Sequence, residues 1–211
     1  PDARRVAAAH QLLRGADVAI EPRRLWPSGL DEPKGRIDVE RQAQPGRALA
    51  RLGDGGWNHL VHVLIERCVA GDAVSVDDEV LAAVAAVLKR WEWDARPSWI
   101  CPVPSRRRAS LVDAVADGLG ALGTLPVHRA LVAPGADTGF QAEQANSAHQ
   151  VANVWERLAV NGTALPTGDV LAGPVLLVDD EVDSRWTMTV ATWMLTGAGA
   201  GPVLPFALRA R

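Results

Sequence analysis

The sequence has few of the features that mark metal-binding, disulfide-rich, membrane-spanning or motor proteins. Its two cysteines, Cys68 and Cys101, are far apart and form no CxxC pair, so neither a zinc site of the usual spacing nor a disulfide framework is expected, and a reducing, cytoplasmic compartment fits best. No apolar run reaches the ~18 residues of a membrane helix, and no signal-peptide pattern is present. No GxxxxGK[ST] phosphate loop occurs, which excludes a motor site of that type within these residues.

A strong charge of either sign is also missing. The net charge is -3 and the pI is about 6.0, so no global basic field attracts the chain to nucleic acid or to an acidic membrane surface. Contact with DNA would need a local patch, and the pairs Arg4-Arg5 and Arg23-Arg24 are interpreted as ordinary solvated residues. The 211 residues are 48% hydrophobic, which suffices for one globular domain with an appendage or for two small domains.

Composition divides the chain near residue 55. Residues 1–55 are rich in Arg, Pro and Gly and show little periodicity, and Gly53-Asp-Gly-Gly56 marks a break. We expect residues 1–55 to be a linker or appendage of short strands and helices that follows a preceding region. Residues 56–211 are expected to form a domain, with a helical lead-in at 56–96 and an α/β core at 97–211.

The second part alternates helical and strand patterns. Apolar residues at one-face helical spacing from Trp57 to Cys68, and again from Val80 to Trp91, predict two helices. Further strands are expected at 99–103, 125–132, 154–160, 175–178 and 203–208, with helices at about 111–122 and 187–195. Alternating β and α units predict an α/β fold with a mostly parallel, doubly wound sheet.

The strongest chemical signal is an apolar strand that ends in two acids. Val175-Leu-Leu-Val178 is an unbroken apolar run, as a strand buried on both faces requires, and Asp179 and Asp180 follow it. Ligands of open α/β sheets bind at this end of the strands. The backbone N–H groups of the next turn, with the hydroxyls of Ser184 and Thr187, form an anion site at a helix N-terminus. The two carboxylates suit the hydroxyls of a ribose, or Mg²⁺ held directly or through water.

A strand ending in two acids has other uses. It also occurs in receiver domains, phosphatases and NTPases, where the acids bind Mg²⁺. Receiver domains have the pair near their start and need a later lysine, whereas here the pair is near the end and the only lysines are Lys34 and Lys89. A phosphate-and-ribose site is therefore favoured.

The strand and turn resemble the phosphoribosyl-diphosphate signature of the type I phosphoribosyltransferases: four apolar residues, two acids, two variable positions, Asp or Thr, Ser or Thr, Gly and Thr. The resemblance implies that fold, with Asp179 and Asp180 on the ribose hydroxyls and Mg²⁺ arriving with the ligand. It implies that the 5′-phosphate is cradled by Asp183, Ser184, Arg185, Trp186 and Thr187. The family usually has Gly at position 185, and the Arg185 guanidinium can either grip phosphate or block the pocket.

A basic loop follows the first strand of the α/β core. Pro102-Val-Pro104 leads into Ser105, Arg106, Arg107 and Arg108. In the family this position holds pyrophosphate, and the segment resembles the competence-associated branch. Three consecutive arginines can neutralise a diphosphate. A solvated basic turn is the alternative.

The polar stretch at 135–150 occupies the position of the family's mobile lid, which closes over the diphosphate. Asn153-Val-Trp155 again resembles the competence-associated branch, but Gln150 stands where an arginine is expected, and the stretch contains no Lys or Arg. His149 is a candidate acid–base group, although a lone surface histidine is more often incidental. The catalytic residues are otherwise unknown, and no element that would recognise an acceptor base is discernible.

A wider resemblance covers most of the chain. Residues 16–27, 34–36 and 44–49 resemble the region that leads into the C-terminal domain of actinobacterial RecQ-like DNA helicases, in which a phosphoribosyltransferase-like domain follows the motor. Residues 183–190 are also similar to that subgroup. The ATP-dependent motor would then lie upstream. The sequence opens on Pro1 rather than on methionine, and we expect an excised piece of a longer protein. A small protein trimmed at its start is the alternative.

Three functions are carried forward. The first is an accessory domain of a RecQ-like helicase, linked to DNA repair, that binds phosphoribosyl diphosphate, ribose 5-phosphate or a nucleotide at residues 175–187, with DNA contacted through the parent helicase. The second is an active Mg²⁺-dependent phosphoribosyltransferase with an unknown acceptor. The third is a ligand-free oligomerisation module. Homo-oligomers are common in the family, which is analogy, and no membrane partner is expected.

Overall fold

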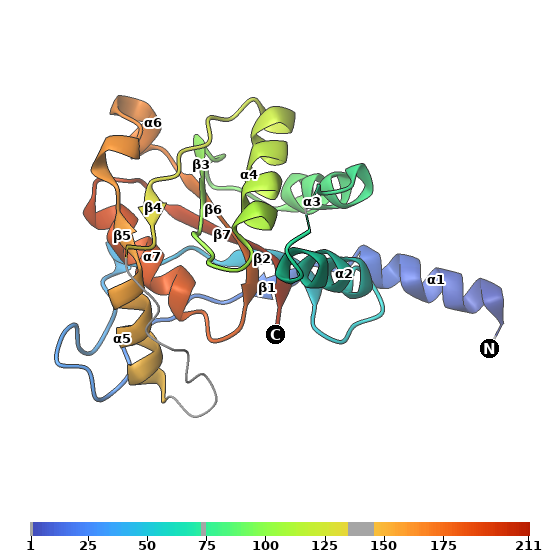
Figure 1. Cartoon of the computed structure of the whole chain (residues 1–211), viewed down its shortest axis with the longest axis horizontal. Coiled ribbons are helices and arrows are strands. Elements are labelled where there is room, and N and C mark those ends of the chain that lie inside the picture. The colour runs from blue at the N-terminus through green and yellow to red at the C-terminus, as the bar shows by residue number, and fades with distance from the viewer. Residues whose placement is uncertain (1, 73–74, 135–145) are drawn as a thin grey trace.

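The computed structural model describes residues 2–72, 75–134 and 146–211. Within these residues the centre is a five-stranded sheet in the order β1-β2-β7-β6-β3 (Figure 1). Neighbouring strands pair in parallel except β1, which is antiparallel to β2. The expected α/β fold with a mostly parallel sheet is confirmed. The strands are β1 (Val18–Ile20), β2 (Gly46–Arg51), β3 (Trp99–Pro102), β6 (Val175–Val182) and β7 (Val203–Ala210).

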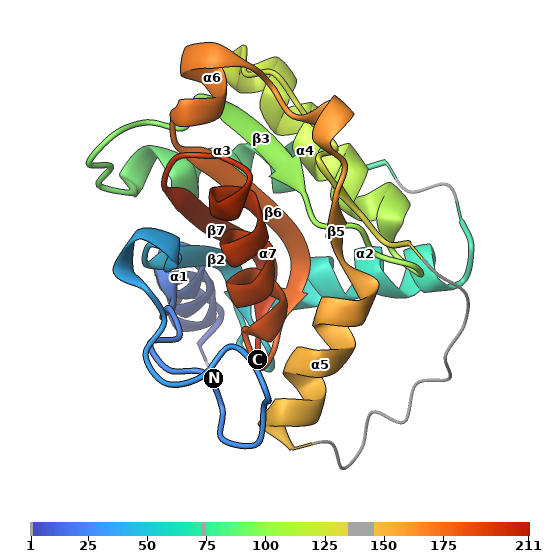
Figure 2. The same ribbon diagram turned by 90° about the vertical axis from the view of Figure 1, so that its left-hand side faces the viewer.

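Helices cover both faces of the sheet (Figure 2). On β6, Leu176 and Val178 belong to the core on one face, whereas Val175 and Leu177 belong to the core on the other. Successive strand residues point to opposite faces, and a central strand covered on both faces therefore needs an unbroken apolar run. The first core is covered by α2 (Asn58–Val69), α3 (Asp78–Arg90) and α4 (Ala109–Gly123), and the second by α5 (Ser147–Arg157) and α7 (Trp186–Gly197).

Smaller elements surround this body. Helix α1 (Ala3–Arg14) extends away from the sheet (Figure 1) and is anchored near its end, where the Trp57 Nε1–H donates to the Arg14 carbonyl at 3.1 Å. Among the described residues, no helix is long and apolar enough to cross a membrane. The other elements are the 3-10 helices η1 (Val39–Arg41) and η2 (Gly162–Ala164), helix α6 (Gly168–Ala172), and the short strands β4 (Leu131–Val132) and β5 (Ala159–Val160).

Residues from the segment 1–55 belong to the central sheet. Strand β2 lies between β1 and β7, and its residues Ala48, Leu49 and Ala50 are buried. The segment expected to be an appendage therefore supplies two of the five strands of the main sheet. Its assignment to a preceding region, and the boundary at residue 55, stay predictions.

Two expected strands are largely wrong. Over 154–160, helix α5 continues to Arg157 and only Ala159–Val160 is a strand; over 125–132, only Leu131–Val132 is one, and the two form a separate antiparallel pair. The apolar residues were misassigned because a helix can present them to the core as well as a strand can. Asn146 marks the start of α5, because its side-chain oxygen accepts the His149 N–H at 3.0 Å.

Candidate functional site

The two acids lie inside strand β6, which continues to Val182 rather than ending at Val178. Asp179 and Asp180 are 6% and 2% exposed. The Asp180 N–H donates to Asp179 Oδ1 at 2.8 Å, so the second acid's backbone fixes the first acid's side chain. A carboxylate buried to this extent needs a charged or hydrogen-bonding partner.

Arg108 supplies that partner. Strand β3 lies beside β6 in parallel, and the loop that follows it brings Arg108 Nε to 2.6 Å from Asp180 Oδ2. The contact is an ion pair rather than a directed hydrogen bond, because Oδ2 receives no aligned N–H. The Arg108 N–H donates to Ser105 Oγ at 3.2 Å, which shapes the loop. The basic loop and the acidic strand are thus brought together at one edge of the sheet.

The rest of the basic loop is more open. Arg106 and Arg107 are exposed, while Ser105 and Arg108 are partly buried. The Arg107 carbonyl faces the Cys68 thiol at 3.7 Å, which ties the loop to α2. Of the expected diphosphate-binding residues, Arg108 is therefore placed at the acids. Ser105 contacts the Arg108 N–H, and Arg107 presents its side chain to solvent.

Burial and neighbouring charges shift the pKa of Asp179. Burial raises the pKa of Asp179 well above its ordinary value, and the neighbouring Asp180 carboxylate raises it further, whereas the more distant charge of Arg108 lowers it. Two acids this close cannot both ionise without cost. The pair therefore tends to hold one proton, with Asp180 the acid that is charge-paired to Arg108.

The turn after β6 has the geometry of an anion site. Helix α7 begins at Trp186 with Arg185 as its N-cap, and the cap makes no side-chain hydrogen bond. The N–H groups of the first helical turn are consequently available to an anion, at the positive end of the helix dipole. Asp183 is exposed, and Ser184 and Thr187 are half-buried, so the turn is accessible.

Arg185 adopts the backbone conformation that usually belongs to glycine. Its φ is 67°, in the left-handed region, which costs a residue with a side chain about 1–2 kcal/mol. The guanidinium does not fold into the turn: Nη1 donates to the Glu21 carbonyl at 3.2 Å. Arg185 therefore follows a backbone path that glycine adopts more readily, and it directs its charge toward the N-terminal segment.

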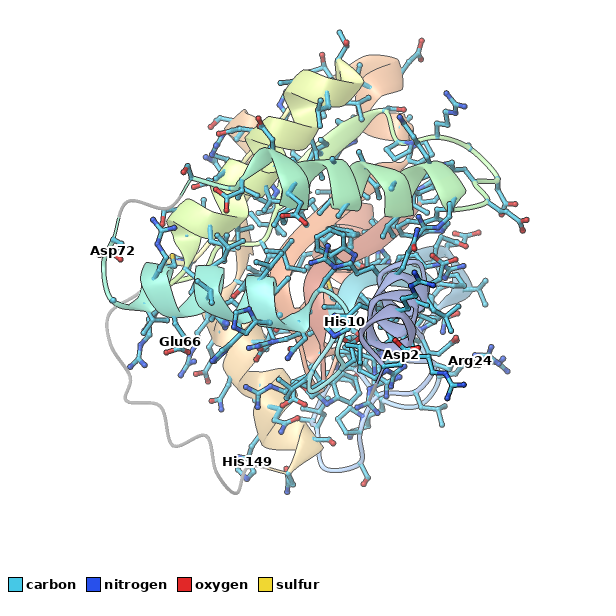
Figure 3. The ribbon with its side chains drawn as sticks, turned by 90° about the vertical axis from the view of Figure 1, so that its right-hand side faces the viewer. Asp2, His10, Arg24, Glu66, Asp72 and His149 are labelled. Carbon is cyan, nitrogen blue, oxygen red and sulfur yellow. The ribbon has the colours of Figure 1, made fainter. Side chains whose placement is uncertain are left out.

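Arg23 holds the other side of the turn. Its Nε and Nη2 donate to the Ser184 carbonyl at 3.1 and 2.8 Å, and its guanidinium lies 4.5 Å from the Trp186 ring centroid. Burial lowers the pKa of Arg23, and the like charge of Arg185 lowers it further. The interpretation of Arg23 as an ordinary solvated residue is wrong, whereas Arg24 is exposed (Figure 3).

Four tryptophans connect the turn to α5. Trp26 lies 6.3 Å from Trp186 in a stacked arrangement, 5.5 Å from Trp155 and 5.4 Å from Trp193. Trp186, one of the expected phosphate-binding residues, is 2% exposed and packs in this cluster. Its side chain is therefore not available to a ligand, and its backbone N–H belongs to the first turn of α7. Aromatic pairs of this kind add about 0.5–1.5 kcal/mol each.

Glu181 is a charged group that the sequence did not single out. It accepts hydrogen bonds from Arg209 on β7 and, at 2.8 Å, from Arg211 Nε. Burial alone would raise the pKa of Glu181, but the hydrogen bond and charge of Arg209 outweigh it and hold the pKa below its ordinary value. The pairing follows from the register of β6 with β7, in which Glu181 lies beside Arg209. A single sequence does not reveal the register between two strands.

His149 lies apart from the acids. It is exposed near the start of α5 (Figure 3) and lines a cavity shared with the loop at 29–32, whose lining includes none of residues 175–187. Most of the expected lid, residues 135–145, lies outside the described part of the chain. His149 is therefore not placed with the acid pair, and a catalytic role for it stays a prediction.

The described residues hold no cluster of three or more His, Cys, Asp or Glu side chains that could bind a metal ion. The acid pair offers two carboxylates, one inclined to protonation and one paired with Arg108. These residues fit Mg²⁺ only where a ligand supplies further oxygens.

No model of a known protein family matches the sequence, and no curated protein matches it. Among solved structures, the chain is similar to the allosteric regulatory enzyme of purine biosynthesis, at 18% identity over 69% of this chain and 25% of the other, with a TM-score of 0.39. Glutamine phosphoribosylpyrophosphate amidotransferase from B. subtilis, complexed with ADP and GMP, gives 18% identity over 69% and 26%, with a TM-score of 0.39. Adenine phosphoribosyltransferase from Leishmania tarentolae gives 12% identity over 64% and 72%, with a TM-score of 0.40. The chain spans about a quarter of the first two proteins.

Proposed function

We propose that this chain is an accessory domain that binds a phosphorylated ribose, as phosphoribosyl diphosphate, ribose 5-phosphate or a nucleotide, at residues 175–187. The observation that carries the proposal is the contact between Arg108 and Asp180 at 2.6 Å. It unites a basic loop and an acid pair at the carboxyl edge of the parallel strands, where ligands of α/β sheets bind.

The phosphate end of the ligand would meet the turn at 183–187. The N–H groups of the first turn of α7 carry no cap from Arg185, and the hydroxyls of Ser184 and Thr187 stand at the same helix end. This set binds an oxyanion through hydrogen bonds and the helix dipole without needing a buried cation. Arg23 and Arg185 hold the turn through the Ser184 and Glu21 carbonyls, so the cradle exists before a ligand arrives.

The ribose end would meet the acids. A ribose offers two hydroxyl donors, and Asp179 and Asp180 offer acceptors that are buried and oriented by the strand. Because the pKa of Asp179 is raised in the ligand-free protein, ribose hydroxyls that donate to this acid would favour its charged form, and binding should release a proton. A diphosphate on the ribose would contact Arg108, and Asp179 and Asp180 would hold the Mg²⁺ that arrives with such a ligand, whose charge would offset that of the diphosphate.

The helicase context is part of the proposal. It rests on the segments at 16–27, 34–36, 44–49 and 183–190, which resemble the C-terminal region of RecQ-like helicases. In that context the domain would report a phosphorylated ribose to a DNA-repair motor in the same chain. The full-length gene tests this directly: a phosphate-loop motor encoded upstream is required, and its absence would remove the helicase assignment without touching the ligand site.

Isothermal titration calorimetry tests the ligand site. The titrants are ribose 5-phosphate and phosphoribosyl diphosphate, each with and without Mg²⁺, with ribose and inorganic phosphate as partial ligands. We expect binding of both phosphorylated sugars, loss of binding in Asp179→Ala with Asp180→Ala, and unchanged binding in Asp169→Asn, which alters an exposed acid on α6. A folded protein that binds neither sugar overturns the proposal, and binding that survives the double variant means that the site is elsewhere.

One observation favours an active transferase as the second candidate. Arg108 of the basic loop contacts Asp180, and at this position its guanidinium could stabilise a departing pyrophosphate. Release of pyrophosphate with an amine or base as acceptor would establish turnover. The ligand-free oligomerisation module has less support, because Arg185 points at the Glu21 carbonyl rather than filling the turn.

A further inference from the structure

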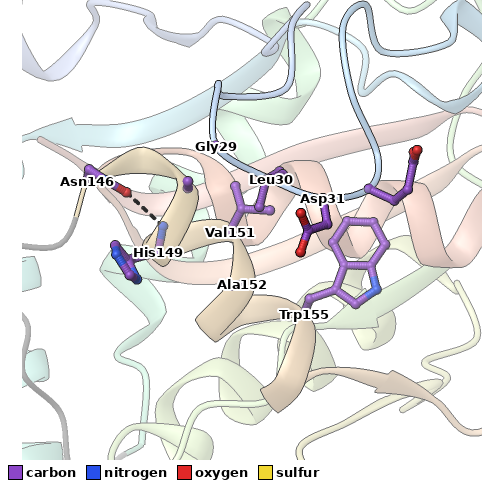
Figure 4. Close-up of a pocket in the computed structure, with 10 residues that line it drawn as sticks. Gly29, Leu30, Asp31, Asn146, His149, Val151, Ala152 and Trp155 are labelled. Atoms are coloured by element: carbon purple, nitrogen blue, oxygen red, sulfur yellow. Dashed lines mark hydrogen bonds between the residues drawn. The ribbon is translucent and has the colours of Figure 1, made fainter.

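A cavity lies on the face of the sheet that α5 and α7 cover, away from the acid pair. It has a volume of about 400 Å³ and opens between the loop at 29–32 and helix α5 (Figure 4). None of its described lining residues belongs to the basic loop or to residues 175–187. A volume of this size is in the range of small-molecule sites, roughly 300–1,000 Å³, so the cavity suits a small ligand.

The loop that forms one wall is held in place at its base. The Trp26 N–H donates to the Gly35 carbonyl at 2.9 Å, and the Ile37 N–H donates to the Arg24 carbonyl at 2.9 Å. At its tip Gly29 has a φ of 96°, and a side chain there would meet Ala148 of α5 at 3.6 Å. The loop therefore approaches α5 closely, and backbone hydrogen bonds at its base hold the wall of the cavity in place.

The interior is apolar and aromatic. Leu30 and Trp155, both partly buried, pack against the core that contains the buried Val151. The Trp155 ring is supported by Trp26, whose centroid lies 5.5 Å away at an angle of 60°. Because that support fixes the ring, the part of Trp155 that lines the cavity is a preformed surface for a planar group.

The rim carries two uncompensated acids. Asp31 and Glu32 line the cavity and are exposed, and neither has an ion-pair partner within the described part of the chain. The described lining contains no Arg or Lys; its other polar side chains are Asn146 and His149. Two carboxylates beside an indole ring attract a cation both by charge and through the ring face.

We propose that this cavity binds a small planar ring that bears a cationic amidine, guanidine or amine. The ring would lie against Trp155, Leu30 and Val151, and the cationic group would donate to Asp31 or Glu32 at the rim, bidentately where it is an amidine or guanidine. The proposal goes beyond the phosphorylated-ribose site and does not depend on it, because the two sites share no residue.

Benzamidine and benzamide test the proposal, since they share one ring and differ in charge. Ligand-detected NMR and calorimetry on the full chain should show that benzamidine binds at least about tenfold more tightly than benzamide. The double variant Asp31→Asn with Glu32→Gln should remove that preference. The matched control is Glu156→Gln. It neutralises an exposed acid on α5 that lies outside the cavity lining, and it should leave benzamidine affinity unchanged.

Two further variants keep the outcome of the test decisive. Trp155→Phe retains a smaller ring and should weaken benzamidine severalfold without unfolding the protein. The variant Asp179→Asn with Asp180→Asn should bind benzamidine as the wild type does, whatever its affinity for ribose 5-phosphate. No benzamidine binding, equal affinity for benzamide, or an unchanged preference after neutralising Asp31 and Glu32 would each overturn the proposal.

Discussion

Arg108 Nε and Asp180 Oδ2 lie 2.6 Å apart, although 72 positions separate the two residues. The side chain of Asp180 is 3% exposed and that of Arg108 is 26% exposed. The arginine thus closes one side of a buried acid and still reaches the surface. In the proposed function, a phosphate group entering from solvent would compete with the Asp180 carboxylate for this guanidinium, which would couple the charge of the acid pair to ligand binding.

Arg108→Ala should weaken binding of phosphoribosyl diphosphate by about 10–100-fold, since a hydrogen bond to a charged group contributes about 1.5–3 kcal/mol. The measurement is calorimetric titration. The control is Arg107→Ala, which removes the same charge from an exposed neighbour and should change affinity by no more than about threefold at physiological salt. Equal losses in the two variants would mean that general charge, rather than the contact with Asp180, determines affinity.

Asp179→Asn should stabilise the ligand-free protein near neutral pH. In the folded protein the pKa of Asp179 is above the ordinary value of 3.8, chiefly through burial. The folded state therefore holds its proton more tightly than the unfolded chain, so this stabilisation is complete below the ordinary value and is lost as pH rises through the raised one. Asn keeps an oxygen for the Asp180 N–H and carries no charge.

Denaturant unfolding at several pH values measures this effect. The stability difference between Asp179→Asn and the wild type should be largest near neutral pH and should shrink toward the ordinary aspartate pKa. Asp169→Asn, at an exposed position, should show no such trend. A variant less stable than the wild type at neutral pH would contradict the assignment.

Glu181→Ala should destabilise the fold by about 3–5 kcal/mol, because it leaves Arg209 as an uncompensated buried charge. The side chains of Arg209 and Glu181 are 6% and 8% exposed. Since the pKa of Glu181 is below its ordinary 4.5, the stability it contributes is present above that value and declines as pH falls through the lowered one. Arg129→Ala, which breaks exposed pairs with Asp113 and Asp117, should cost about 1 kcal/mol or less. Urea unfolding curves of the two variants check both figures.

Strands β6 and β7 were predictable because burial on both faces requires apolar runs in their sequences. Asp179, Asp180 and the basic loop could be singled out because they directly follow apolar runs in the sequence. What could not be predicted depends on register and on distant packing. The Glu181–Arg209 pair requires the alignment of β6 with β7, and the Arg23–Ser184 contact joins residues 161 positions apart.

The N-terminal strands illustrate the same limit. Val18–Ile20 and Gly46–Arg51 are short, and the arginines, prolines and glycines of the segments around them resemble a linker when no partner strand is visible. The strand expected at 154–160 was misassigned for a different reason. Trp155 belongs to a helix that packs one side on α7, and a short apolar run does not distinguish a helix from a strand.

Arg185→Gly should leave ribose 5-phosphate affinity within about threefold of the wild type, because the guanidinium is directed at the Glu21 carbonyl and the backbone path already suits glycine. Relief of about 1–2 kcal/mol of left-handed strain offsets the lost hydrogen bond and the flexibility of glycine. Arg185→Val keeps a branched side chain at φ 67° and should be clearly less stable than Arg185→Gly. A tenfold change in affinity for Arg185→Gly would show that the guanidinium contacts the ligand or obstructs it.

A chain that begins at residue 56 should fail to fold, because removing β1 and β2 exposes the full edge of β7. That strand is buried along its length, and β2 pairs with it from Arg47 to Arg51. An apolar, unpaired edge of this kind promotes association with other chains. A chain that begins at Ala16 loses only α1, whose described side chains are exposed apart from the partly buried Arg14, and should unfold cooperatively with a melting temperature within several degrees of the full chain. Circular dichroism and size-exclusion chromatography on the two truncations provide the test. A soluble, monomeric and cooperatively folded 56–211 fragment would show that the first strands are an appendage after all, and that β7 is stable as an edge.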